Sequence, residues 1–67
     1  MKNLILNIYS NKTDKRISRI LITQLILNNY QININEENFT ELFETELLSD
    51  IMYQNNINSS EVYYELK

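Results

Sequence analysis

The chain has 67 residues, a net charge of −3, and neither Cys nor His. A chain of this length forms at most one domain with a small core. The missing residue types exclude disulfides, the common zinc, haem and iron–sulfur ligands, and Ser-His or Cys-His nucleophiles. We therefore expect residues 1–67 to be a single non-enzymatic domain with no catalytic residues, no cofactor and no metal site. Stability must come from helix packing or self-association, so a homodimer is as compatible with the sequence as a monomer.

The longest apolar stretches are only a few residues, as at 25–27, far below the roughly 20 residues that span a bilayer. The apolar run near the start is broken by Asn7 and is followed by no small-residue cleavage site, so it does not resemble a signal peptide. We expect no membrane association and a cytoplasmic protein, in the host cytoplasm if the gene is viral. Eleven Asn and ten Ile, with no Gly, Pro or Ala, are typical of an AT-rich gene and favour a low-GC genome, a phage or another mobile element.

The first predicted element is a strand over residues 3–9, where Leu4, Leu6 and Ile8 alternate with the residues between them. A short helix is the alternative there. A helix is predicted over 13–28, because apolar residues recur at helical spacing and the pair at 28–29 ends the pattern. Its apolar face is wide, which predicts that it is sandwiched between other elements or covered by a second copy.

Residues 30–35 are predicted to be a second short strand or an extended linker. The clearest helix follows over 36–54, with Asn35 as its cap and Ile34 placed to contact Phe39. Because the chain has no Gly or Pro, Asn residues mark the breaks between elements.

The last predicted element is a short third helix over 59–66. Asn58 and Glu61 have the spacing of a capping box, and Ile57 can contact the apolar residue at 62. A strand is the alternative, since Val62, Tyr64 and Leu66 alternate. The expected fold class is therefore α+β, with an N-terminal strand, two main helices and a short third helix. An all-α three-helix domain is the alternative.

Charge is divided along the chain. Residues 1–35 contain five basic side chains and one acidic side chain, whereas residues 36–67 contain eight acidic side chains and one basic. Acids at helix starts and on solvated surfaces explain part of this division. The other interpretation is a negative helical face that suits a basic protein partner, with tyrosines as anchors. The candidate partner-binding residues are Glu37, Glu41, Glu44, Asp50, Tyr53, Glu61, Tyr63 and Tyr64.

A basic cluster lies at the start of the predicted first helix. Such a cluster is either an ordinary solvated surface or a set of phosphate contacts with salt-sensitive affinity. The candidate nucleic-acid-binding residues of this alternative are Lys12, Lys15, Arg16 and Arg19.

Two resemblances to DNA-binding families bear on that alternative. Residues 46–67 resemble a helix-turn-helix, with Ile51, Ile57, Val62 and Leu66 at its apolar positions. This resemblance implies that the last helix enters the major groove, although its acidic residues would repel phosphates. A strand followed by two helices is also similar to the ribbon-helix-helix dimers, which implies an intertwined dimer that reads DNA with a paired strand.

The favoured interpretation is a non-enzymatic regulator or inhibitor, phage- or mobile-element-encoded, that docks its acidic helical face on a basic protein surface. A small dimeric DNA-binding transcriptional regulator and a structural subunit of a larger complex are the alternatives. The subunit alternative rests on the wide apolar face of the predicted first helix.

Overall fold

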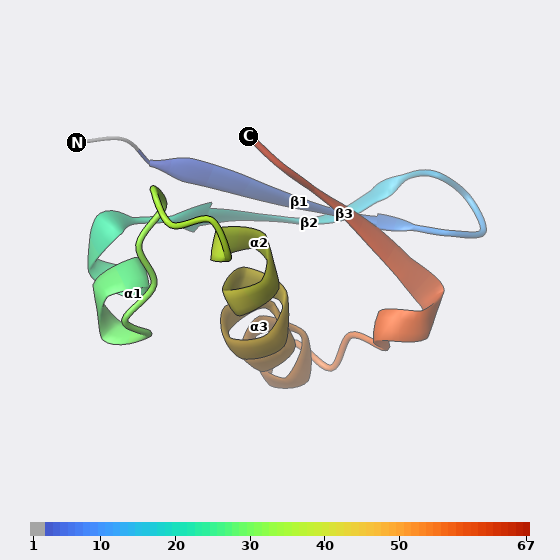
Figure 1. Ribbon diagram of the computed structural model, residues 1–67. Helices are drawn as coiled ribbons and strands as arrows, with labels where there is room; N and C mark the ends of the chain where they lie inside the picture. Colours follow the sequence, from blue (N-terminus) through green and yellow to red (C-terminus); the bar gives the residue numbers. More distant parts are fainter. Residues whose placement is uncertain (1–2) are drawn as a thin grey trace.

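In the computed structural model, described for residues 3–67, a three-stranded antiparallel sheet carries helices on one of its faces (Figure 1). The strands are β1 (Leu4–Ser10), β2 (Arg16–Ile22) and β3 (Val62–Leu66), in the order β2-β1-β3. The helical elements are α1 (Gln24–Asn29), α2 (Phe39–Leu42), η1 (Phe43–Leu48), α3 (Ser49–Gln54) and the 3₁₀ turn η2 (Ser59–Glu61). This arrangement confirms the predicted α+β class and excludes the all-α alternative.

β1 confirms the strand predicted over 3–9, but the helix predicted over 13–28 is wrong. A hairpin leads into β2, where Ile20 pairs with Leu6 and Ile22 pairs with Leu4. β-Branched residues at alternate positions suit a strand with one buried face. The apolar residues of the same run also have helical spacing. The strand forms because pairing with β1 satisfies the backbone N–H and C=O groups of both strands.

Only the end of the predicted first helix is helical. α1 begins after Thr23, whose hydroxyl accepts a 3.3 Å hydrogen bond from the backbone N–H of Ile26. It ends at Asn29, as the sequence predicted, and Gln31 then adopts a left-handed backbone with φ of 56°. Of the two alternatives for residues 30–35, the linker is the one found.

α2, η1 and α3 form one continuous helix of 16 residues, which corresponds to the helix predicted over 36–54. It begins later than predicted, at Phe39, so Asn38 and not Asn35 precedes its first residue, and the Asn38 side chain accepts no capping hydrogen bond. After Phe39, its core-facing side chains come in adjacent pairs at 42–43, 47–48 and 51–52. The step of five residues from the first pair to the second is longer than the 3.6 residues of an α-helical turn. The π-helical turn η1 spans this longer step and so lets both pairs face the core. The core-facing side chains of the helix are Phe39, Leu42, Phe43, Leu47, Leu48, Ile51 and Met52.

The helix predicted over 59–66 is also wrong, although its capping signal is real. The Asn58 carboxamide accepts a 3.1 Å hydrogen bond from the Ser60 N–H and donates a 3.2 Å hydrogen bond to Glu61. These contacts cap only the turn η2. The chain then continues as β3 and occupies the second edge of β1, which confirms the strand alternative.

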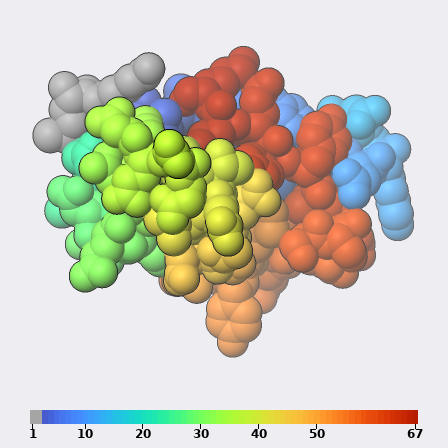
Figure 2. Space-filling model, viewed as in Figure 1, coloured from blue at the N-terminus to red at the C-terminus, as the bar shows by residue number. Residues whose placement is uncertain are grey.

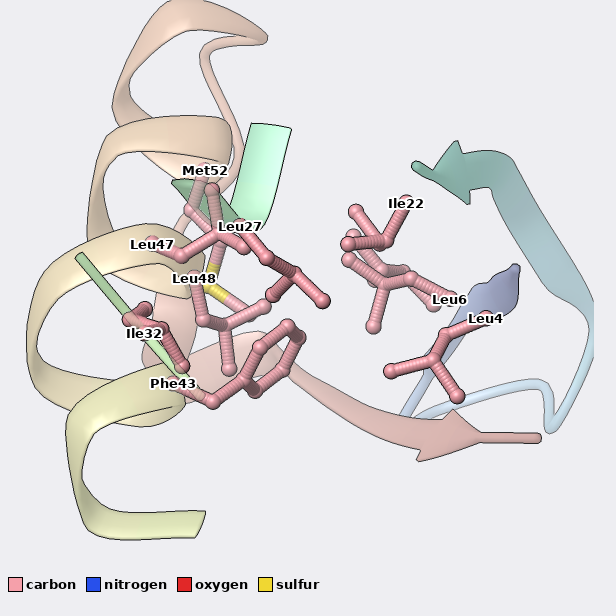
Figure 3. Close-up of a cluster of buried hydrophobic side chains, with 10 residues drawn as sticks. Leu4, Leu6, Ile22, Leu27, Ile32, Phe43, Leu47, Leu48 and Met52 are labelled. Atoms are coloured by element: carbon pink, nitrogen blue, oxygen red, sulfur yellow. The ribbon is translucent and has the colours of Figure 1, made fainter. Parts of the chain in front are cut away.

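The core lies between the sheet and the helices (Figure 3). Leu4, Leu6 and Ile8 of β1 face it, and Phe43 and Leu47 of the long helix meet them. Burying a side chain of this size stabilises the fold by about 1.5–3 kcal/mol. The fully buried side chains are Phe43, Leu6, Ile8, Ile22, Leu27 and Leu47.

The topology differs from both DNA-binding resemblances. β1 is the central strand, and both of its edges are paired within the chain, so it cannot form the intermolecular ribbon of a ribbon-helix-helix dimer. Residues 62–66 form a strand, so the second helix of a helix-turn-helix is absent from the described residues 3–67. Within that same range, no helix is both long enough and apolar enough to traverse a bilayer.

Candidate functional site

The exposed side of the long helix carries carboxylates with no basic neighbour along the chain. Residues 36–66 contain no Lys or Arg. Within the described part of the chain, the one salt bridge joins Glu65 to Lys67, with 3.4 Å between Oε1 and Nζ. Glu37, Glu41 and Glu44 line one shallow groove along the first half of the helix. We call these three residues the acidic row.

A second groove runs between the long helix and β3, with a volume of about 620 Å³. Glu44 lines this groove as well as the first, so the acidic row continues directly into it. Four of the predicted partner-binding residues therefore share one surface, together with apolar side chains at the groove floor. We call this the tyrosine groove, and its lining includes Glu44, Met52, Tyr53, Ile57, Tyr63 and Tyr64.

Tyr64 fixes the carboxylate at the junction of the two grooves. Its hydroxyl donates a 2.9 Å hydrogen bond to Oε1 of Glu44, and its ring lies 5.8 Å from that of Phe43. Burial of the phenol, followed by the hydrogen bond to this carboxylate, raises the pKa of Tyr64 to about 12. The hydroxyl therefore remains a donor across the physiological pH range.

Asp50 lies apart from the acidic row. Its Oδ2 accepts a 2.8 Å hydrogen bond from the hydroxyl of Tyr30, which follows α1. This hydrogen bond is the main cause that raises the pKa of Tyr30. The sequence predicted Asp50 to lie with Glu41 and Glu44 on the polar side of the helix, whereas in the structure Asp50 contacts Tyr30.

The other three predicted partner-binding residues, Tyr53, Glu61 and Tyr63, lie in different environments. Tyr53 is 85% exposed, the highest value among the large hydrophobic side chains, and the helix end that carries it projects from the surface in orange (Figure 2). Glu61 caps η2 locally through Asn58. Tyr63 lines the tyrosine groove, but its ring stacks on Tyr9 at 5.2 Å on the other side of the sheet.

The basic candidates lie on and beside β2. Lys12 and Lys15 belong to the hairpin that connects β1 to β2, while Arg16 and Arg19 belong to β2 itself. The prediction that all four share the start of a helix is wrong. Tyr9 was not among the candidate site residues predicted from the sequence. Tyr9 pairs with Tyr63, and Tyr63 lies in β3, which was predicted to be a helix.

Residues 3–67 contain no group of three carboxylates placed to hold a metal ion. No protein-family model, curated protein or solved structure matches the chain.

Proposed function

We propose that this protein is a non-enzymatic regulator or inhibitor that docks the acidic row and the tyrosine groove on a basic surface of a protein partner. One observation carries the proposal. Glu44 belongs to both surfaces, and the 2.9 Å hydrogen bond from Tyr64 holds its carboxylate at their junction.

The acidic row supplies long-range attraction. Its three carboxylates are exposed and have no salt-bridge partner among residues 3–67. A patch of one sign accelerates association with an oppositely charged partner and disfavours acidic competitors.

The tyrosine groove supplies contact area. Tyr53 stands at its rim as a large exposed ring, and half-buried Ile57 lies in its lining. Aromatic anchors beside a pocket are the residues that most often dominate binding free energy. Because Tyr64 already holds Glu44, less side-chain freedom is lost when a partner binds.

The gene source and compartment belong to the same proposal. The AT-rich composition supports a phage or another mobile element, and the site of action would be the cytoplasm of the host cell. A small acidic regulator of this kind needs no cofactor.

The test uses a defined probe, a fluorescent amphipathic helical peptide with Lys and Arg on its polar face. A peptide with Glu at the same positions is the negative control. Fluorescence anisotropy should show that the double variant Glu41→Lys/Glu44→Lys binds the basic peptide at least about tenfold more weakly than the wild type, or ~1.4 kcal/mol.

The matched control is Glu36→Lys/Glu46→Lys, which changes the net charge equally but affects residues outside both grooves. Equal weakening by both double variants would mean that only net charge matters and would overturn the docking site. Unchanged binding by Glu41→Lys/Glu44→Lys would overturn the proposal outright. Tyr53→Ser should weaken binding without changing its salt dependence.

A further inference from the structure

The face of the sheet opposite the helices is uncovered, as Figure 1 shows. Leu4, Leu6 and Ile8 point into the core, so the intervening residues of β1 and their cross-strand partners point the other way. We call this surface the open face. It consists of three cross-strand rows, which are Leu21, Ile5 and Lys67, then Arg19, Asn7 and Glu65, then Arg16, Tyr9 and Tyr63.

Two aromatic rings form a platform in the last row. Tyr9 and Tyr63 stack with 5.2 Å between centroids and 16° between planes. Tyr63 is 43% exposed, and its hydroxyl donates a 3.2 Å hydrogen bond to Asp14, which steadies the ring. Arg16 lies directly across from Tyr9. Aromatic rings next to a guanidinium group suit the stacking of unpaired bases.

The open face is basic although the whole chain is acidic. Arg16, Arg19 and Lys67 oppose a single carboxylate, Glu65, which already pairs with Lys67. The adjoining hairpin adds Lys12 and Lys15 against one carboxylate, Asp14, so the positive charge continues there.

The acids of the long helix lie in the other layer of the molecule. The protein is 20–21 Å across in its two shorter dimensions, whereas the Debye length at physiological ionic strength is about 8 Å. The carboxylates on the outer side of the helix are therefore largely screened from a ligand on the open face.

Asn7 occupies the centre of the open face. It is only 5% exposed and is the single buried polar residue within 3–67. Its Oδ1 lies 3.5 Å from Nη1 of Arg16, a long contact that orients the guanidinium group. Asn is disfavoured in central strands, where a β-branched residue would pack better. A carboxamide at this position instead supplies the acceptor that holds Arg16 over the open face.

We propose that the open face binds single-stranded nucleic acid. Bases stack on the platform of Tyr9 and Tyr63, while Arg16 and Arg19 contact phosphates and the lysines of the hairpin extend the path. A duplex fits less well, because its bases are stacked internally and are read by elements that enter a groove. A second copy placed face to face would bring the arginines of both copies together, which is unfavourable.

The binding test uses the full chain and a fluorescent oligothymidylate or oligouridylate of about ten nucleotides, with a blunt duplex as control. Fluorescence anisotropy should detect binding to the single strands at low salt and much weaker binding to the duplex. The logarithm of the association constant should fall linearly with the logarithm of salt concentration, with a slope of about −0.7 per phosphate contact.

Variants separate stacking from charge. Tyr9→Leu/Tyr63→Leu keeps the charge and should weaken binding at least about fivefold, since stacking contributes strongly for each base. Arg16→Gln/Arg19→Gln should flatten the salt slope by about 1.4, which corresponds to two phosphate contacts. Glu46→Gln on the long helix is the control and should leave affinity within about twofold of the wild type.

Circular dichroism establishes that each variant folds, and amide chemical-shift changes in the wild-type protein map the site without any substitution. Shifts confined to β1, β2 and β3 support the proposal. It is overturned if the oligonucleotides do not bind, if the duplex binds as tightly, or if the tyrosine variant binds like the wild type. Equal competition by an acidic peptide, or occlusion of the face by a second copy in sedimentation analysis, would also overturn it.

Discussion

The hydroxyl of Tyr64 donates a 2.9 Å hydrogen bond to Glu44, and this contact ties the edge strand β3 to the long helix. The ring also lies against Phe43, so one side chain connects the sheet, the core and the acidic surface. Both the packing of the domain and the geometry of the tyrosine groove therefore depend on this residue.

Stability should decrease in alkali because of Tyr64. Its pKa is about 12 in the folded protein, against an ordinary value of 10.0 for a tyrosine side chain in water, so the folded state holds the phenolic proton more tightly than the unfolded state. The free energy of unfolding falls with rising pH wherever the folded state binds more protons than the unfolded state. The stabilisation from Tyr64 is therefore complete below pH 10 and is lost as the pH rises towards 12.

Urea unfolding at several pH values between about 9 and 12, compared with Tyr64→Phe, measures this contribution. The difference between wild type and variant should shrink as the pH rises through that window. Tyr53→Phe removes a hydroxyl from an exposed ring and is the matched control for loss of a phenol. A constant difference would mean that neither burial nor the hydrogen bond to Glu44 favours the neutral phenol.

Phe43 should be the most sensitive core position. It is 1% exposed and its ring lies 6.0 Å from that of Phe39. Replacement of a buried Phe by Ala costs about 3–5 kcal/mol, which equals the roughly 3–5 kcal/mol that the core of so small a domain supplies. Phe43→Ala should therefore be largely unfolded by circular dichroism at room temperature, whereas the half-buried Phe39→Ala should remain folded. Similar losses at the two positions would contradict the central place of Phe43.

Gln31→Gly should stabilise the protein. Gln31 has a φ of 56°, a left-handed conformation that costs a residue with a Cβ roughly 1–2 kcal/mol. Glycine removes this cost but loses about 0.5–1 kcal/mol more backbone entropy on folding than alanine. The net gain of about 0.5 kcal/mol or more should raise the melting temperature by a few degrees for a domain of this size.

Asn56→Gly provides the comparison, since Asn56 has a φ of 55° but tolerates that region through its side chain. The gain at residue 56 should be smaller than at residue 31. A lower melting temperature for Gln31→Gly would argue against the left-handed turn at that residue.

The sequence predicted elements that depend on neighbouring residues better than strands that depend on pairing with a distant segment. The strand over 3–9, the helix over 36–54 and the cap formed by Asn58 and Glu61 depend on neighbours in the chain. β2 and β3 depend on residues far away, since both form only because β1 offers two free edges. The runs ending at Ile22 and Leu66 fit a helix and a strand equally well by spacing alone.

The candidate site shows the same limit. Glu41 and Glu44 come together because residues three apart are neighbours on a helix surface. Asp50 turns towards Tyr30 instead, and the open face was missed because it needs three paired strands before its rows exist.

Asn7→Val should separate stability from nucleic-acid binding. Valine suits a central strand better than asparagine, and the scale of such preferences is about 1 kcal/mol. Arg16 is exposed and can be hydrated once its 3.5 Å contact with Asn7 is gone, so no buried group loses its partner. The variant should be more stable in urea by up to about 1 kcal/mol, yet it should bind oligouridylate roughly threefold or more weakly.

Ser18→Val is the matched control for that change. Ser18 pairs with Ile8 on the helix side of the sheet, so the substitution alters strand preference without touching the open face. It should change urea stability and leave oligonucleotide affinity as in the wild type. If Asn7→Val instead destabilised the protein, Asn7 would be a structural residue, because a side chain kept for binding should be replaceable at no cost in folding.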